Sequence, residues 1–389
     1  MADLLWPGDE RAGEVFTDTA FLDAMVAVEQ AWLDALAAAG IADSTRLAGI
    51  VGSADVDRIA AGAEAGGNPV IGLVALLRER TGSSWVHRGL TSQDVLDTAL
   101  VLCLGDAVAR VRDDLRRQAV ALAGLAREHR ATVMAGRTLT QYAVPITFGL
   151  KVATWLQGVV AAADRLDRCP TLPAQLGGAA GTLAAPTELA GSVEAAQVVV
   201  ADASARLGLA VAAPWHTERS VLTEHADALV GCADAWGRIA ADVALLSRPE
   251  IGELREAAGG GSSTMPGKAN PVLSVLLRRH ALAAPALAAT LHSAASAYVD
   301  ERPDGAWHAE WDTLRTLARR SVVAASQAAD LLEGLVVDGP RMSARAAEAD
   351  ETLRSEQRSM GGFEAPYLGA TDRIIDAALE RAASVWKDL

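Results

Sequence analysis

The stretch SSWVHRGLTSQDVLDTALVLCLGDAVARVRDDLRRQAVALAGLAREH, residues 83–129, passes from a Ser/Thr-rich polar turn into one very long apolar-periodic pattern. Apolar residues at three- and four-residue spacing predict a helix of roughly 25 residues or more. A helix of that length, apolar over a wide face, suits a bundle that buries surface against other bundles as well as within itself. We therefore expect an oligomer that assembles through its central helices.

Helical patterns also dominate the rest of the chain. An amphipathic helix follows the capping segment FTDTA, begins near Phe21 and stops at Gly40. Further long periodic segments lie at about 145–169, 187–207, 218–247, 271–299 and 308–336. Strand-like alternation is absent throughout, so we predict an all-α fold. Changes in pattern divide it into an N-terminal helical domain (1–104), a central bundle (105–339) and a short C-terminal helical region (340–389).

Composition narrows the class of protein. The chain has 389 residues and a formal charge of -14, which argues against a nucleic-acid or anionic-membrane surface. Cys103, Cys169 and Cys232 lie far apart within or beside apolar helical stretches, so we expect core thiols rather than disulfides or a metal cluster. The first ten residues lack a signal-type core, and no uninterrupted apolar run reaches about 18 residues. We therefore predict a cytoplasmic protein.

A different kind of segment, GGGSSTMPGKANP, occupies Gly259–Pro271. It is not a phosphate loop, because that motif requires Ser or Thr after the lysine and Ala269 stands there. A flexible linker is the simpler alternative, but the segment leads into a long helix and carries Lys268, one of three lysines in the chain. Glycines for motion, serines for proton transfer and a helix start for an anion together fit a lid that closes over a carboxylate.

Two further polar turns precede long helical patterns. HRGLTSQD spans His87–Asp94, and GRTLTQYAVP spans Gly136–Pro145. Capping of the next helix explains either turn taken alone, and for Thr91, Ser92 and Asp94 it is the favoured interpretation. Three such segments, each offering hydroxyls, amides or a cation, instead indicate one site assembled from separate parts of the chain.

These residues carry a family resemblance. GSSTMPGKANP closely resembles the signature of the fumarase/aspartase superfamily, and GLTSQDVLDTAL and GRTLTQYAVPITFGLKVATWL resemble its two other active-site segments in the expected order. Within the superfamily, HRGLTSQDVLDTAL, PWHTERSVLTEHADAL and ERPDGAWHAEWDTL are most similar to the cycloisomerases that act on 3-carboxy-cis,cis-muconate. Adenylosuccinate lyases share the shape of the first segment, so that branch stays open.

The resemblance implies a long helical bundle flanked by smaller helical regions. Members are homotetramers with a twenty-helix core, each active site draws on three subunits, and no cofactor is required. The implied substrate is a small polycarboxylate. In the cycloisomerases an internal carboxylate adds across a double bond, the charge moves onto a neighbouring carboxylate to give an aci-carboxylate, and protonation of carbon completes the lactone.

Residue roles carry over by position. Ser262 is expected to transfer the proton in a closed site where Lys268 and backbone N–H groups make its hydroxyl reactive. Lys268 and Asn270 are expected to hold the carboxylate that becomes the aci-anion. The other expected substrate contacts come from His87, Thr91, Ser92, Arg137, Thr138 and Gln141.

This chain departs from the superfamily pattern at two positions. Leu139 stands where many lyases carry histidine, and Tyr142 stands at a second such position. The absence of histidine at these two positions argues against lyases that protonate a nitrogen leaving group, and it affects a lactone-forming enzyme less. His216 and His308 remain candidates for proton transfer, although for each a structural histidine bonded to backbone is favoured.

Two other functions remain open. One is a superfamily lyase that cleaves a succinyl compound to fumarate or a related product, and the other is a non-catalytic tetrameric scaffold. A scaffold is expected to lose the reactive residues of the mobile segment, whereas Ser262, Lys268 and Asn270 are all present.

Overall fold

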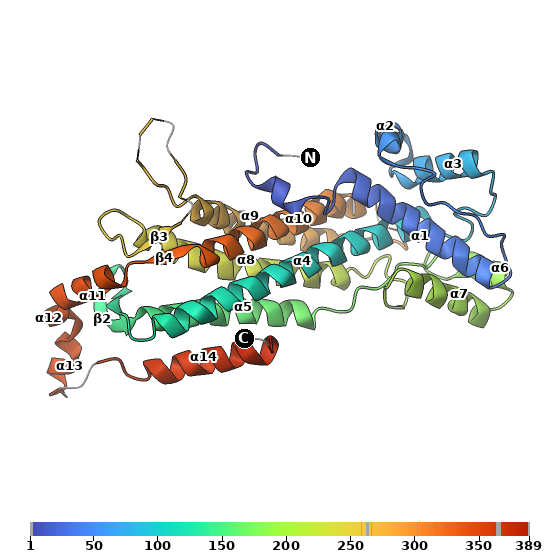
Figure 1. Cartoon of the computed structure of the whole chain (residues 1–389). Helices are drawn as coiled ribbons and strands as arrows, with labels where there is room; N and C mark the ends of the chain where they lie inside the picture. The colour runs from blue at the N-terminus through green and yellow to red at the C-terminus, as the bar shows by residue number, and fades with distance from the viewer. Residues whose placement is uncertain are drawn as a thin grey trace. The chain divides into compact units, whose positions relative to one another are not determined.

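The computed structural model is built of helices and two short two-stranded sheets (Figure 1). It describes residues 3–257, 259–261, 264–265, 267–302, 304–362 and 367–387. The chain forms two compact units, each assembled from three separated segments, and the predicted division into three consecutive domains stays a prediction. The segment boundaries fall inside or next to α4 (Ser92–Glu128), α5 (Phe148–Arg168), α8 (Ser220–Leu246), α9 (Val272–Ser296) and α10 (Gly305–Glu333).

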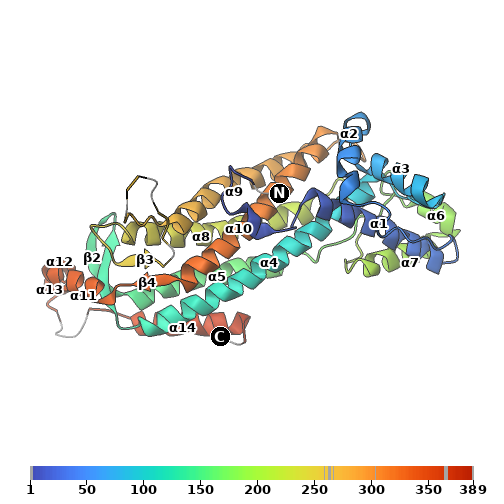
Figure 2. The same cartoon turned by 45° about the horizontal axis from the view of Figure 1, so that its top comes forward.

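Unit 1 consists of residues 1–109, 169–227 and 286–320. Its remaining elements are η1 (Asp9–Ala12), α1 (Asp18–Ala38), η2 (Ser53–Asp55), α2 (Val56–Gly66), α3 (Val70–Thr81), α6 (Ala184–Ala190) and α7 (Val193–Arg206). The predicted cap of the first long helix is present, since the Thr17 hydroxyl accepts a hydrogen bond from the Ala20 N–H at 3.2 Å. Helices α1 and α7 lie side by side (Figures 1 and 2).

Unit 2 consists of residues 110–168, 228–285 and 321–389. Besides α5 it contains β1 (Val133–Thr138), β2 (Gln141–Thr147), β3 (Leu254–Glu256), β4 (Leu335–Val337), α11 (Gly339–Glu348), α12 (Asp350–Leu353), α13 (Ser355–Ser359) and α14 (Thr371–Val385). Helix α14 packs along α5, and α11 and α12 pack on the β1–β2 hairpin (Figure 2). The C-terminal region therefore covers the hairpin and one helix of this unit.

The predicted all-α class is confirmed, and the longest helix is the one that the opening stretch predicts. Helix α4 runs for 37 residues, and its apolar positions are buried over most of that length. Fully buried side chains such as Val95, Leu104 and Leu115 each stabilise the fold by roughly 1.5–3 kcal/mol relative to exposure. Burial of a wide face, rather than intrinsic helix propensity, thus holds this helix together.

Two local expectations are wrong. GRTLTQYAVP is not a polar turn but the tip of an antiparallel hairpin in which Thr138 pairs with Gln141. Its strands have only six and seven residues, too few for the alternation to stand out from helical patterns. The predicted helix at 187–207 is divided at Gly191, where φ is 81°, and α7 restarts with Ser192 as its N-cap.

Helix α9 has an apolar surface that neither unit covers fully. By length and composition alone it meets the requirement for a membrane span, although one such helix is weak evidence. Only 28% of its apolar window is buried, and Val275 and Leu282 are 55% and 81% exposed. This helix therefore presents apolar side chains outward from the chain.

Candidate active site

The first polar segment forms a tight turn at the N-terminus of α4. Ser92 is the first residue of the helix, and the Asp94 side chain accepts the Thr91 N–H at 2.9 Å. This reach-back contact is half of a capping box, so the capping interpretation is confirmed for Asp94. The Thr91 hydroxyl is not the cap acceptor; it receives a long hydrogen bond from Arg302 at 3.4 Å. The turn therefore places two hydroxyl-bearing residues at a helix start, where partial positive charge favours an anion.

His87 precedes this turn in an unusual conformation. Its φ is 63°, in the left-handed region that residues with a side chain seldom occupy. The ring Nδ1 lies 2.6 Å from Glu29 Oε1, and the Glu29 carboxylate is fully buried. Because a buried carboxylate needs a partner, the Glu29 contact fixes His87 where the structure places it.

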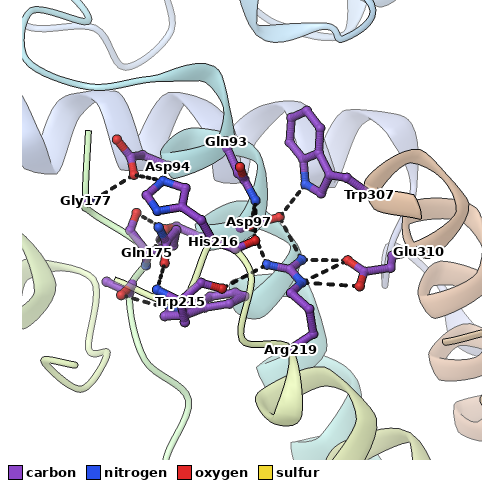
Figure 3. A network of polar contacts seen from close by, with 12 residues as sticks. Gln93, Asp94, Asp97, Gln175, Gly177, Trp215, His216, Arg219, Trp307 and Glu310 are labelled. Atoms are coloured by element: carbon purple, nitrogen blue, oxygen red, sulfur yellow. Dashed lines mark hydrogen bonds and ion pairs between the residues drawn. The ribbon is translucent and has the colours of Figure 1, made fainter. Parts of the chain in front are cut away.

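Behind the turn lies a buried polar network that joins three of the segments used for the family resemblance. Arg219, from PWHTER, is fully buried and donates to Asp97 of α4 and to Glu310 of α10 (Figure 3). The Trp307 indole N–H, from GAWHAEW, also donates to Asp97, at 2.8 Å. From the sequence alone, none of these residues is assigned to the site, because acids on an apolar helix reveal nothing of partners that lie 91 or more positions away.

The charges in this network compensate only in part. Burial disfavours the charged guanidinium, but the Asp97 and Glu310 carboxylates outweigh it and raise the pKa of Arg219. Burial also raises the pKa of Glu310, although Arg219 opposes that shift. Two carboxylates thus share one cation, and Glu310 accepts a proton more readily than a carboxyl in water does.

The two candidate histidines differ in their surroundings. His308 Nε2 lies 2.8 Å from the Gly67 carbonyl and its Nδ1 lies 3.2 Å from the Asp304 carbonyl, as the structural interpretation requires. His216 is buried with Nε2 3.3 Å from Asp94 Oδ1, yet within the described part of the chain neither ring nitrogen makes a hydrogen bond. The structural interpretation therefore fits His308, while His216 forms a separate contact beside Asp94.

The second segment lies in unit 2, on the β1–β2 hairpin. Arg137 lies 3.3 Å from Glu253, a fully buried carboxylate that Arg345 also contacts at 3.2 Å, and its guanidinium lies 5.4 Å from the Tyr142 ring centre. Thr138 and Gln141 are exposed, and Leu139 at the tip is 97% exposed. The hairpin therefore carries one anchored cation and a solvent-facing tip.

The third segment connects β3 to α9, also in unit 2. Gly260 and Asn270 form an antiparallel bridge with N–H to carbonyl distances of 2.9 and 2.8 Å, and the Asn270 amide donates to the Gly261 carbonyl at 3.2 Å. Lys268 is exposed, and Ser262 lies outside the described residues. At the loop base, Glu256 accepts the Ser274 N–H and hydroxyl at 2.9 and 2.7 Å. The bridge between Gly260 and Asn270 thus joins the two ends of the loop, and we call this bridge the neck of the loop.

A cavity of about 420 Å³ lies at this neck and is lined in part by Gly259, Ala269, Asn270 and Glu256. The structure groups Arg137, Thr138, Gln141, Lys268 and Asn270 in unit 2 and His87, Thr91 and Ser92 in unit 1. Within the described ranges, no three His, Cys, Asp or Glu side chains gather as a metal site. The substrate-binding and catalytic assignments stay predictions.

The fold and these segments define a class of protein. A family model described as lyase matches residues 57–284, more than half of the chain. The chain belongs to this lyase family, and the resemblance to the fumarase/aspartase superfamily is confirmed.

Individual relatives are more specific. The chain is 45% identical to nitrosuccinate lyase of Streptomyces davaonensis over 84% of this chain and 73% of the relative. It is 41% identical to 3-carboxy-cis,cis-muconate cycloisomerase of Pseudomonas aeruginosa over 84% of this chain and 74% of the relative. Among solved structures, the 3-carboxy-cis,cis-muconate lactonizing enzyme from Pseudomonas putida superposes with a TM-score of 0.81 at 33% identity, covering 96% of this chain and 86% of that one.

Proposed function

We propose that this protein is a cofactor-independent cycloisomerase that converts 3-carboxy-cis,cis-muconate to 4-carboxymuconolactone. The observation that carries this proposal is the hairpin tip, where Leu139 replaces the histidine of many superfamily lyases and cannot donate a proton. An amine-type leaving group, which is a poor anion, needs such a proton. In the lactone the group that leaves in the reverse reaction is a carboxylate, which departs as a stable anion. Relatives named as this cycloisomerase, 37–41% identical, support the proposal.

The proposed reaction needs one proton and two carboxylate sites. A carboxylate oxygen of the substrate attacks an alkene carbon, and the electron pair moves toward a neighbouring carboxylate held by Lys268 and Asn270. Ser262 then gives its proton to carbon, and the serine alkoxide that remains takes up a proton from water, which restores the hydroxyl for the next turnover. Thr91 and Ser92 hold a second carboxylate at the start of α4. Preorganised donors to the carboxylate that becomes the aci-anion typically contribute about 3–4 kcal/mol each to transition-state stabilisation.

A nitrosuccinate lyase is the second candidate, favoured by the 45% identity to that relative. Removal of a proton next to a carboxylate, followed by loss of nitrite from the adjacent carbon, gives a butenedioate. Nitrite, like a carboxylate, departs as a stable anion, so a histidine acid is again unnecessary. The two candidates therefore use the same donors and differ in the substrate.

A homotetramer is the proposed assembly, with the cytoplasm as its location. The outward apolar side chains of α9, including Leu282 at 81% exposure, support burial against other copies of the chain. In the proposed tetramer, Thr91 of unit 1 and Lys268 of unit 2 reach one site from different subunits.

The deciding experiment offers both substrates to the same protein. Loss of the diene absorbance of 3-carboxy-cis,cis-muconate, without nitrite release from nitrosuccinate, is the expected result. Nitrite release with a steady diene signal would move the assignment to the lyase, and turnover of neither compound would reject both candidates.

Matched lysine variants test the loop. Lys268→Met is expected to lower kcat roughly 10²–10³-fold, and Ser262→Ala by a similar factor. Lys387→Met serves as the control, because Lys387 is also exposed and lies near the C-terminus. Mixing the Lys268→Met protein, impaired in kcat, with the Ser92→Ala protein, impaired in substrate binding, should restore part of the activity at low substrate concentration through hybrid sites; no recovery after subunit exchange would count against a shared site.

A further inference from the structure

The Asp94 side chain makes more contacts than a helix cap requires. Its fully buried carboxylate accepts the N–H groups of Thr91 at 2.9 Å, Gly177 at 2.8 Å and Gly178 at 3.0 Å. The first contact is local, whereas the other two cross more than 80 residues of sequence to the loop between α5 and α6. All four residues belong to unit 1. Asp94 thus ties the start of α4 to a second backbone segment.

The second segment is shaped to let its backbone approach. A Cβ added at Gly177 would lie 2.6 Å from His216 Cε1 and 2.7 Å from Pro214 Cβ, so no side chain fits there. Gly178 has a φ of 74°, a left-handed conformation that glycine adopts without strain. These two glycines turn successive N–H groups toward one carboxylate. An amide at position 94 offers one acceptor oxygen where the carboxylate offers two.

His216 closes the other side of this arrangement. Its Nε2 lies 3.3 Å from Asp94 Oδ1, and the Gln93 amide donates to the His216 carbonyl at 2.9 Å (Figure 3). Neighbouring residues of α4 thus hold the backbone and the ring of His216, and the ring packs on Gly177. Asp94 is enclosed by partners that leave its carboxylate little room to turn.

These contacts fix the Thr91–Ser92 turn through the N–H and the carbonyl of Thr91. The Thr91 N–H is held by the Asp94 carboxylate, and the Thr91 carbonyl accepts the Asp94 N–H at 3.0 Å. We propose that Asp94 is a positioning residue, which sets the orientation of the Thr91 and Ser92 hydroxyls toward the second substrate carboxylate by anchoring their turn to Gly177–Gly178. This inference rests on the proposed function, because it assumes that the turn binds a carboxylate.

Thr98, one helical turn further along α4, provides a matched control. Its buried hydroxyl donates to the Gln175 carbonyl and accepts the Gln175 N–H, both at 2.9 Å. Thr98→Val therefore removes two hydrogen bonds between the same helix and the same loop without touching Asp94. Both Asp94→Asn and Thr98→Val should lower the thermal midpoint by several degrees, since each leaves buried backbone groups without a partner.

Kinetics separate positioning from stability. The second carboxylate keeps its charge through the reaction, so its contacts contribute equally to ground state and transition state. Asp94→Asn is expected to raise KM on the order of tenfold, the equivalent of about one charge-assisted hydrogen bond, with kcat changed less than about threefold. Thr98→Val is expected to leave KM within about twofold of the wild-type value.

Ligand binding without turnover distinguishes this inference from the proposed function. Propane-1,2,3-tricarboxylate should bind the wild-type protein and Thr98→Val with similar Kd by calorimetry, and Asp94→Asn on the order of tenfold more weakly. If wild-type protein turns over a substrate and binds this probe but Asp94→Asn does both equally well, the positioning role is wrong. Equal KM increases in Asp94→Asn and Thr98→Val would also overturn it. If the wild-type protein neither binds nor reacts, the proposed function itself has failed.

Discussion

Two polar turns that look alike in the sequence are supported very differently in the structure. His87, before α4, and Leu139–Thr140, at the hairpin tip, all adopt positive φ, at 63°, 47° and 71°. His87 is held by the buried Glu29, and the next carbonyl, of Arg88, accepts the Trp32 indole N–H at 2.8 Å. At the tip, Leu139 is 97% exposed and the Thr140 hydroxyl accepts a hydrogen bond from the adjacent Gln141 side chain.

The difference shows where the fold can maintain an unfavourable left-handed backbone conformation. A left-handed residue with a side chain costs roughly 1–2 kcal/mol, and it persists where surrounding contacts over-determine it. At His87 those contacts are buried within unit 1. At the tip, the described residues provide hairpin pairing and little else. We infer that the first turn is rigid, whereas the tip is restrained mainly by hairpin pairing.

The largest expected effect comes from removing the cation beneath the rigid turn. Arg219→Met leaves Asp97 and Glu310 buried without their partner, and breaking such a pair costs about 3–5 kcal/mol. Urea denaturation at neutral pH measures the loss. Arg58→Ala is the control, because its pair with Glu79 is more than 60% exposed on both sides and should matter by less than about 1 kcal/mol.

The pH dependence of the Arg219→Met loss identifies its cause. A carboxyl whose folded pKa is raised binds protons more tightly when folded, so stability is gained as pH falls toward and below that pKa. Burial already raises the pKa of Glu310, and removal of Arg219 takes away the opposing charge. The deficit should therefore shrink as the pH is lowered from neutral toward the ordinary glutamate pKa of about 4.3. A deficit that is constant over this range would assign the loss to packing instead of charge.

A smaller effect is expected at the supported left-handed residue. His87→Gly relieves the backbone but leaves the Glu29 carboxylate buried without its contact, a net loss of about 1–2 kcal/mol. In a Glu29→Met background the same substitution should be neutral or stabilising, because only the relief of the backbone remains. Equal losses in both backgrounds, measured by urea denaturation, would show that the contact does not support His87.

The sequence predicts more of this molecule in its long helices than in its short connections. The 37-residue α4 and the loop before α9 are evident from periodicity and motif. The hairpin escapes notice because six- and seven-residue strands show too little alternation. Asp94 is visible as a cap, but its bonds to Gly177 and Gly178 depend on tertiary contacts that no local pattern encodes.

The smallest expected effect, and the one of opposite sign, lies at the tip. Thr140 is β-branched with φ at 71°, and a two-residue hairpin turn with left-handed central residues favours glycine there. Thr140→Gly should therefore stabilise the protein by up to about 1 kcal/mol, the relief of strain less the extra chain entropy of glycine. Urea denaturation followed by tryptophan fluorescence, to which the buried Trp155 of unit 2 contributes, would measure this gain in the free energy of unfolding. A loss of 1 kcal/mol or more would mean that the tip is as firmly supported as His87, because the hydroxyl or its pairing with Gln141 would then outweigh the backbone strain.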